Sequence, residues 1–265
     1  MDGPDEAAGL ILDLLRARRP APWLVALAGI PGAGKSTVAA AVAARVPGAV
    51  MVPMDGYHLP RAALTADGLA RRGAPDTFDP DALRADLLSL REDGRGAFSA
   101  FDHATKDPQP GAVVVLPGVP LVIVEGLYLL LRSWRLADLF DVSVFLDCDL
   151  ETALDRVAAR HLACGLAATP GDARHRADTN DRRNARTVLD DGGCERADLV
   201  VPACGWTPPR TRHVTGGSHH ENRDSHTPVV SFRPAICLAL TLLGVAPRCP
   251  STSRCPSPAT CPCAP

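Results

Sequence analysis

The fold of this 265-residue chain is decided by the stretch GIPGAGKS at residues 29–36. It fits the pattern G-x-x-x-x-G-K-[ST] of the phosphate-binding loop without a mismatch. Glycines let backbone N–H groups surround an anionic oxygen cluster in conformations that a side chain would obstruct. Lys35 is expected to reach the β- and γ-phosphates, and the Ser36 hydroxyl to hold Mg²⁺. The stretch therefore predicts a site for a nucleoside triphosphate.

The residues on either side of this loop support the same interpretation. Residues 24–28 (LVALA) read as a short buried strand, and the alanine- and valine-rich residues 37–45 read as a helix. The N-terminus of that helix adds its dipole to the phosphate site. The alternative is a glycine-rich turn that fits the pattern of the phosphate-binding loop by chance. Such a turn would have no reason to lie between a strand and a helix. The predicted nucleotide-binding residues are Gly29, Gly32, Ala33, Gly34, Lys35, Ser36 and Thr37.

Composition limits the class of partner. The formal net charge of −2 and the absence of a basic block give no electrostatic reason to expect a nucleic-acid partner. The acidic N-terminus lacks the basic start and apolar core of a signal peptide, and no apolar run is long and uninterrupted enough to span a membrane. We therefore expect a cytoplasmic protein that binds no membrane. The sequence leaves a homodimer open.

Strand-like and helix-like segments alternate through the first 205 residues, which predicts an α/β fold with a parallel sheet and helices on both faces. In such sheets ligands bind at the carboxyl ends of the strands. The further strands are expected at 49–52, 121–124, 142–146 and 199–201, and the further helices at 7–18, 80–91, 150–163 and 171–189.

Two acidic residues follow predicted strands. Asp55 comes directly after residues 49–52, and Glu125 comes directly after residues 121–124. At neighbouring strand ends beside the phosphate loop, these carboxylates could share Mg²⁺ and a substrate hydroxyl. Asp55 alone could instead be a turn former before Gly56, and Glu125 alone a helix-start residue.

Several further motifs resemble those of the phosphoribulokinase/uridine kinase superfamily of P-loop kinases, and most closely its bacterial nucleoside-kinase-like and pantothenate-kinase-like branch. The resemblance extends from about Trp23 to Val201. Its motifs are DGYH at 55–58, RRGAPDTFD at 71–79, FDH at 101–103 with Asp107 and Pro108, EGLYLLL at 125–131 with Trp134, and a lid-like series comprising Arg156, Arg160, His161, Gly165, Asn180, Asp181, Asn184 and Ala185.

The resemblance implies a role for four of these residues. Asp55 corresponds to the base that accepts the proton of the acceptor hydroxyl, and Glu125 to the acid that helps to hold Mg²⁺. Arg156 and Arg160 correspond to lid arginines that close over the phosphates, where a guanidinium suits developing phosphate charge. Each could also be an exposed helix charge. The candidate acceptor contacts are His58, Arg72, Asp102 and His103.

Two positions and one segment depart from the pattern of the superfamily. His103 stands where arginine is usual, and Lys106 stands where an acid is frequent, so the acceptor pocket is expected to differ. Residues 206–265, rich in proline and cysteine, lose the strand–helix alternation and resemble nothing in the superfamily. We predict a kinase domain at 1–205 and a disordered tail at 206–265.

The predicted function is ATP-dependent, Mg²⁺-assisted phosphorylation of a hydroxyl group on a small metabolite, such as a nucleoside, a sugar or a pantothenate-like alcohol. A kinase with a nucleotide phosphate as acceptor would not need the base Asp55. A GTPase-like or other nucleotide-binding switch would be favoured by a guanine-reading N-K-x-D or T-K-x-D motif. The chain has only Thr105, Lys106 and Asp107 in direct succession, which does not fit. An inactive nucleotide binder is the remaining alternative.

Overall fold

The computed structural model describes residues 3–18 and 20–204. Within them, five strands form one sheet in the order β2-β5-β1-β6-β7, and every neighbouring pair is parallel. The strands are β1 (Trp23–Gly29), β2 (Val50–Pro53), β5 (Leu121–Gly126), β6 (Val142–Cys148) and β7 (Leu199–Cys204). All five were predicted from the sequence, and the parallel α/β sheet is confirmed.

The central strand β1 is buried on both faces. All of its residues after Trp23 are inaccessible to solvent, although successive side chains point to opposite sides of the sheet. Helices therefore flank the sheet, as the continuous apolar runs indicate. α1 (Pro4–Arg18) packs on α2 (Lys35–Ala43), and α2 contacts β1, β2 and β5. α4 (Pro80–Asp93) begins with the side chain of Asp79 accepting a hydrogen bond from the Ala82 amide.

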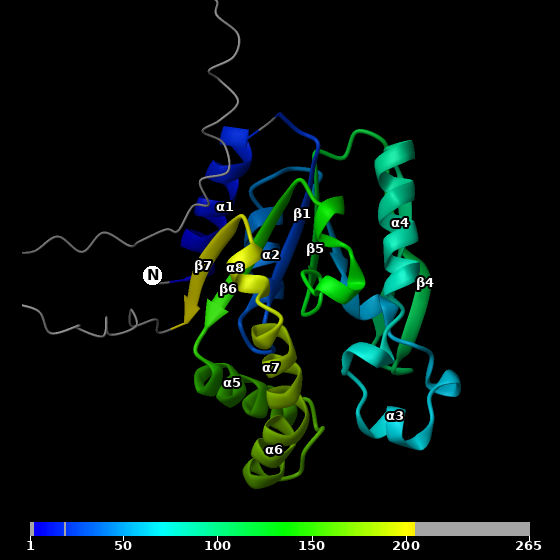
Figure 1. The fold of residues 1–265 in the computed structure, drawn as a ribbon, viewed down its shortest axis with the longest axis vertical. Coiled ribbons are helices and arrows are strands. Elements are labelled where there is room, and N and C mark those ends of the chain that lie inside the picture. Colours follow the sequence, from blue (N-terminus) through cyan, green and yellow to red (C-terminus); the bar gives the residue numbers. More distant parts are fainter. Residues whose placement is uncertain (1–2, 19, 205–265) are drawn as a thin grey trace, which may run out of the picture. The chain divides into compact units, whose positions relative to one another are not determined.

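A two-stranded antiparallel sheet was not predicted. It is made of β3 (Gly96–Asp102) and β4 (Asp107–Val115), and it lies beside α4 (Figure 1). It packs on the short 3-10 helix Met54–Tyr57 that follows β2. Gly56 makes this contact possible, because a Cβ atom there would lie 2.0 Å from the Ser99 carbonyl oxygen. The second sheet thus lies against the element that contains Asp55.

The carboxyl ends of the parallel strands meet at one edge of the sheet, and the remaining helices lie beyond it (Figure 1). α5 (Leu150–Ala163), α6 (Pro170–Arg176) and α7 (Arg182–Asp190) lie below the ends of β6 and β7, and α3 (Ala66–Ala70) lies across from them. The helix predicted at 171–189 is formed by α6, a π-helical turn (Ala177–Asp181) and α7. α8 (Gly193–Arg196) leads into β7. Further 3-10 helices are Arg61–Ala63, Pro75–Thr77, Arg132–Trp134 and Ala137–Leu139.

Two sequence-based predictions fall at or beyond the limit of the described residues. The tail at 206–265 and the domain boundary after residue 205 lie outside them, so both stay predictions. In the part of the chain that the structure describes, no helix is long and apolar enough to cross a membrane.

Candidate active site

The phosphate-binding loop connects β1 to α2, as predicted. Gly32 has a φ of 80°, and a Cβ atom there would lie 2.2 Å from the carbonyl oxygen of Ala153 in α5. Glycine is therefore required both for the backbone conformation and for the close approach of α5. Lys35 and Ser36 are the first two residues of α2, so their backbone amides lie at a helix N-terminus that attracts anions.

The ammonium group of Lys35 lies against the loop itself. Its Nζ atom donates hydrogen bonds to the carbonyl oxygens of Gly29 at 3.0 Å and Ile30 at 2.9 Å. Burial lowers the pKa of Lys35 to about 8, although the nearby carboxylates of Glu125 and Asp55 act in the opposite direction. Lys35 is thus buried beside two acids, at a place where its positive charge can interact with a bound phosphate.

Ser36 and Glu125, the two residues predicted from the sequence to hold Mg²⁺, lie side by side. The Ser36 hydroxyl donates a hydrogen bond of 2.9 Å to Glu125 Oε1. Glu125 is the penultimate residue of β5 rather than a helix-start residue, and burial raises its pKa while Lys35 opposes that shift. A hydroxyl and a carboxylate side by side are oxygen ligands of the kind that Mg²⁺ prefers, with phosphate and water completing its coordination. The residues present therefore fit this ion.

Asp55 lies close to this pair. β2 and β5 are neighbours in the sheet, with Pro53 opposite Glu125, and Asp55 follows two residues later in the 3-10 helix Met54–Tyr57. Its side chain is exposed, whereas Met54 and Tyr57 on either side are buried. The two predicted acids thus occupy adjacent strand ends beside the phosphate loop.

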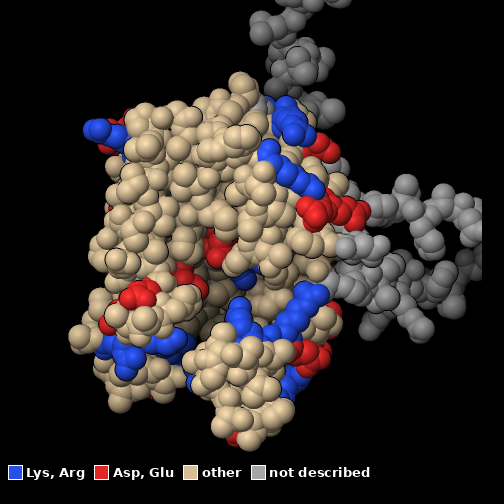
Figure 2. Space-filling view, turned by 180° about the vertical axis from the view of Figure 1, so that it is seen from behind, with Lys and Arg blue, Asp and Glu red and all other residues tan. Residues whose placement is uncertain are grey.

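Two adjoining hollows open at this edge of the sheet. The first, of about 590 Å³, is lined by the loop residues Pro31, Gly32, Gly34, Lys35, Ser36 and Thr37. The second, of about 1130 Å³, contains only Ser36 from the loop and extends to the β3–β4 hairpin. Asp55 and Glu125 line both hollows, so they lie where the two meet. Figure 2 shows the opening between two lobes, with acidic side chains on its upper wall and basic ones around its lower part.

Both predicted lid arginines are on α5. Arg156 lines the first hollow, Arg160 lines both, and Arg176 from α6 also lines both. Among the described residues, none of the three guanidinium groups has a hydrogen bond or an ion pair. These cations are therefore available to an anionic ligand.

A buried histidine–carboxylate pair lies beneath the arginines. His161 Nε2 is 3.6 Å from Asp181 Oδ2, where the π-helical turn ends. Burial lowers the pKa of His161 and raises that of Asp181, so each group is biased towards its neutral form. Both residues line the first hollow, and Asn184 lies beside them in that wall.

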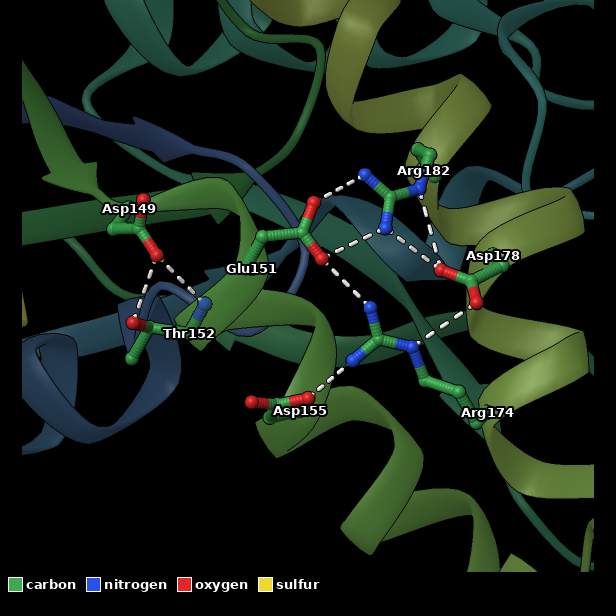
Figure 3. A network of polar contacts seen from close by, with 7 residues as sticks. All are labelled: Asp149, Glu151, Thr152, Asp155, Arg174, Asp178 and Arg182. Atoms are coloured by element: carbon green, nitrogen blue, oxygen red, sulfur yellow. Dashed lines mark hydrogen bonds and ion pairs between the residues drawn. The ribbon is translucent and has the colours of Figure 1, made fainter. Parts of the chain in front are cut away.

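An ion-pair network links α5 to α6, the π-helical turn and α7 (Figure 3). Glu151 on α5 accepts from Arg182 at 2.8 Å and from Arg174 at 2.7 Å. Arg174 also bonds Asp155 on α5 and bonds Asp178 at 3.0 Å, and Arg182 bonds Asp178 at 2.8 Å. We call α5, α6, the π-helical turn and α7 the lid segment. The network joins all four of its parts.

The predicted acceptor contacts do not all face the hollows. His58 lines both and stacks on Phe78 with ring centroids 3.9 Å apart. His103 lines only the second hollow. Asp102 lines neither; its carboxylate accepts hydrogen bonds from the Ala104 amide at 2.8 Å and the Thr105 hydroxyl at 2.9 Å, which stabilises the β3–β4 turn.

Arg72 lines both hollows, but its guanidinium already has protein partners. It donates to the carbonyl oxygens of Lys106 and Leu59, and it pairs with Asp107 at 3.2 Å. Burial lowers the pKa of the nearby His58, and the positive charge of Arg72 acts in the same direction. Arg72 therefore positions the hairpin turn against the loop that follows the 3-10 helix.

Three basic residues of the hollows had no predicted role. Arg176 and Arg61 belong to no quoted motif, and Lys106 entered only as a departure from the usual pattern. Arg61 follows Pro60 at the start of a 3-10 helix, and its amide donates a 2.8 Å hydrogen bond to Asp107. Only the tertiary fold brings these residues to the opening.

Comparison with known proteins agrees with this geometry. The sequence model of a protein family described as "Phosphoribulokinase / Uridine kinase family" matches residues 24–163 of this chain. The chain belongs to this family. Within it, a Schizosaccharomyces pombe protein named "Putative uridine kinase C227.14" is 35% identical over 200 residues, which cover 69% of this chain and 84% of that protein.

Two further matches support a kinase. An Aspergillus versicolor protein, "ATP-dependent kinase-like protein notR'", is 40% identical over 149 residues, covering 51% of this chain and 87% of that protein. The crystal structure of a "putative fructose transport system kinase" from Silicibacter sp. TM1040 has a TM-score of 0.62 at 37% identity and covers 72% of this chain and 95% of that chain. The protein is an ATP-dependent kinase with a P-loop fold.

Proposed function

We propose that this kinase transfers the γ-phosphoryl group of ATP to a hydroxyl group of a small metabolite, with Asp55 as the base. The observation that carries the proposal is the position of Asp55 between the two hollows. The phosphate loop lies in the first, and the second is large enough for a separate molecule. A carboxylate at their junction can accept the proton of a hydroxyl that faces the γ-phosphate.

Three basic residues that line the first hollow supply positive charge. Lys35 reaches the transferred phosphoryl group from the loop, and Arg156 and Arg160 approach it from α5. Phosphoryl transfer depends largely on positioning and on charge stabilisation, and arginine suits the equatorial oxygens. Ser36 and Glu125 would hold Mg²⁺, which would further neutralise the negative charge of the phosphates when it is bound.

The acceptor is a nucleoside, a sugar or a pantothenate-like alcohol on this proposal. The relatives named as a uridine kinase and a fructose transport system kinase are consistent with a hydroxyl acceptor. His58 and His103 line the acceptor side and are proposed to contact it. Asp102 is proposed to act only indirectly, by holding the turn that presents His103 and Lys106.

A nucleotide-binding switch without an acceptor is the alternative function. A switch would use the phosphate loop and the pair Ser36 and Glu125. A switch would have no use for the carboxylate of Asp55 at the second hollow.

A panel assay separates the kinase from the switch. ATP consumption and phosphorylated product are measured with uridine, fructose, ribose, pantothenate, glycerate and their simple derivatives. The kinase proposal predicts that at least one compound accelerates ADP formation and is itself phosphorylated in a 1:1 ratio with ADP. Slow ATP hydrolysis that no compound accelerates would instead favour the switch.

A further inference from the structure

The second hollow has an excess of positive charge on the side that faces away from the phosphate loop. Arg61 and Lys106 line this hollow and not the first, so both lie beyond Asp55 as seen from the loop. Arg61 precedes α3, and Lys106 ends the β3–β4 turn, so two separate segments converge on the same region.

Neither of these two cations has a counter-charge. Among the residues that the structure describes, no side-chain hydrogen bond or ion pair involves Arg61 or Lys106. The nearest candidate, Asp107, already pairs with Arg72 at 3.2 Å and accepts from the backbone amide of Arg61. The other residues that line only this hollow are uncharged or basic, and none is acidic; they include the apolar Leu69, Phe101 and Leu166 together with His103 and Cys164.

The carboxylates of the second hollow are on its opposite side. Asp55 and Glu125 are the only acidic side chains that line it within the described part of the chain, and both are shared with the first hollow. On that side Ser36 donates a hydrogen bond to Glu125, and the charge of Lys35 interacts with both carboxylates; on the proposed function they also face Mg²⁺. These two carboxylates therefore do not offset the positive charge of Arg61 and Lys106 on the other side of the second hollow.

The backbone at Lys106 is held in a defined conformation. Lys106 has a φ of 60°, a left-handed conformation that a non-glycine residue adopts at a cost. Its amide bonds the Asp102 carbonyl at 2.8 Å and its carbonyl accepts from Arg72, so both ends of the residue are fixed. The lysine is held at the hollow rather than placed on a freely varying loop.

We infer that the phosphoryl acceptor is an anion, a hydroxyl compound with a carboxylate or phosphate group that pairs with Arg61 and Lys106. This inference rests on the proposed kinase function and narrows its acceptor class. The hydroxyl faces Asp55 and the anionic group faces the opposite wall. A neutral acceptor would leave both cations without a partner and would forgo charge-assisted hydrogen bonds.

Matched pairs of acceptors test the inference. Glycerate with glycerol and pantothenate with pantothenol form the carboxylate arm; ribose 5-phosphate with ribose and fructose 6-phosphate with fructose form the phosphate arm. In at least one pair, the anionic member should have a kcat/KM about tenfold or more above that of its neutral partner, as loss of a charged hydrogen bond implies. The two arms show which anionic group is recognised.

A double variant assigns the effect to these two residues. Arg61→Gln combined with Lys106→Asn, in which asparagine tolerates the left-handed backbone, should raise the KM of the preferred anion at least about tenfold. The KM of ATP should change by less than about twofold, since neither residue lines the nucleotide hollow. The control is Arg186→Gln, an exposed position on α7 that lines neither hollow.

Each outcome has a distinct meaning. Neutral members that match or exceed their anionic partners would overturn the anionic acceptor and leave the kinase proposal intact. The anionic acceptor is equally overturned if the double variant keeps full selectivity for the anion. If no compound in either arm, nor uridine, accelerates ATP consumption, the proposed function itself is wrong and the acceptor inference fails with it.

Discussion

Asp55→Asn is the substitution that most directly tests the proposed chemistry. The Asp55 side chain is exposed, and no hydrogen bond or ion pair within the described residues involves its carboxylate. Asparagine has the same shape and loses only the charge and the basicity. We therefore expect the thermal midpoint to stay within about 1 °C of that of the unmodified protein, because surface substitutions away from packing or caps have small effects.

The expected loss of turnover is large. General-base assistance contributes about 10²- to 10⁴-fold, which corresponds to about 2.7 to 5.5 kcal/mol of activation free energy. The Kd of ATP should change little, since the phosphate loop is unaltered. The substitution also has an indirect effect, which must be distinguished from loss of the base. The negative charge of Asp55 favours the protonated form of Lys35, so removal of that charge lowers the pKa of Lys35 further below about 8. Measurement at pH 6.5 favours the protonated form of Lys35 in both proteins.

The assay pairs ATP binding by calorimetry with acceptor phosphorylation on the same preparations. Asp138→Asn is a suitable control, because Asp138 is exposed and lies in a 3-10 helix that lines neither hollow. Asp55→Asn with turnover within about threefold of the unmodified protein would refute the base assignment. A parallel loss of ATP affinity and turnover would show that Asp55 acts through the nucleotide site instead.

Three further predictions concern the nucleotide site. Glu125→Gln should raise the Mg²⁺ concentration for half-maximal activity at least about tenfold while the Kd of metal-free ATP stays nearly constant; unchanged Mg²⁺ dependence would make Glu125 a structural residue. ATP binding should take up a larger fraction of a proton at pH 8.5 than at pH 6.5, because phosphate charge raises the pKa of Lys35 from about 8. Binding enthalpies in buffers of different ionisation enthalpy measure this uptake, and Lys35→Met should abolish the difference. The affinity for ATP should accordingly fall as the pH rises above 8. Gly32→Ala should abolish ATP binding, because its Cβ atom would lie 2.2 Å from the Ala153 carbonyl oxygen, whereas Gly111→Ala, with nothing within 4 Å, should retain it.

The parallel sheet and the phosphate site could be predicted because their signals are local. The loop has a fixed pattern, and the apolar runs of β1, β5 and β6 extend over several consecutive residues. Asp55 and Glu125 could be assigned to one edge because parallel strands end at the same edge. That the two acids are close depends also on β2 and β5 being neighbours, which the order of the sheet supplies.

The β3–β4 hairpin could not be predicted for the opposite reason. Its second strand contains Pro108, Pro110 and Gly111, which read as turn residues, and most of its first six residues are exposed. The strand forms there because β3 pairs with it and packs on the 3-10 helix Met54–Tyr57, at a separation that sequence periodicity does not reveal.

The acceptor side was harder to predict for a related reason. Asp102 and His103 are adjacent in sequence, yet one turns back to hold the hairpin turn and the other faces the second hollow. Arg61 and Arg176 come from segments about a hundred residues apart and have no motif of their own. The wall of a cleft built from loops is a property of the tertiary fold, and single residues in it carry little local signal.

The ion pairs within the lid segment have a consequence for how the two substrates influence each other. Glu151 is on the same helix as Arg156 and Arg160, and its partner Arg174 is on the same helix as Arg176. If bound nucleotide phosphates draw α5 inward, these ion pairs would carry α6 with it, and Arg176 of α6 lines both hollows. Each ligand should then favour the arrangement that the other requires, so that ATP and acceptor bind with positive cooperativity and raise one another's affinity by the same factor.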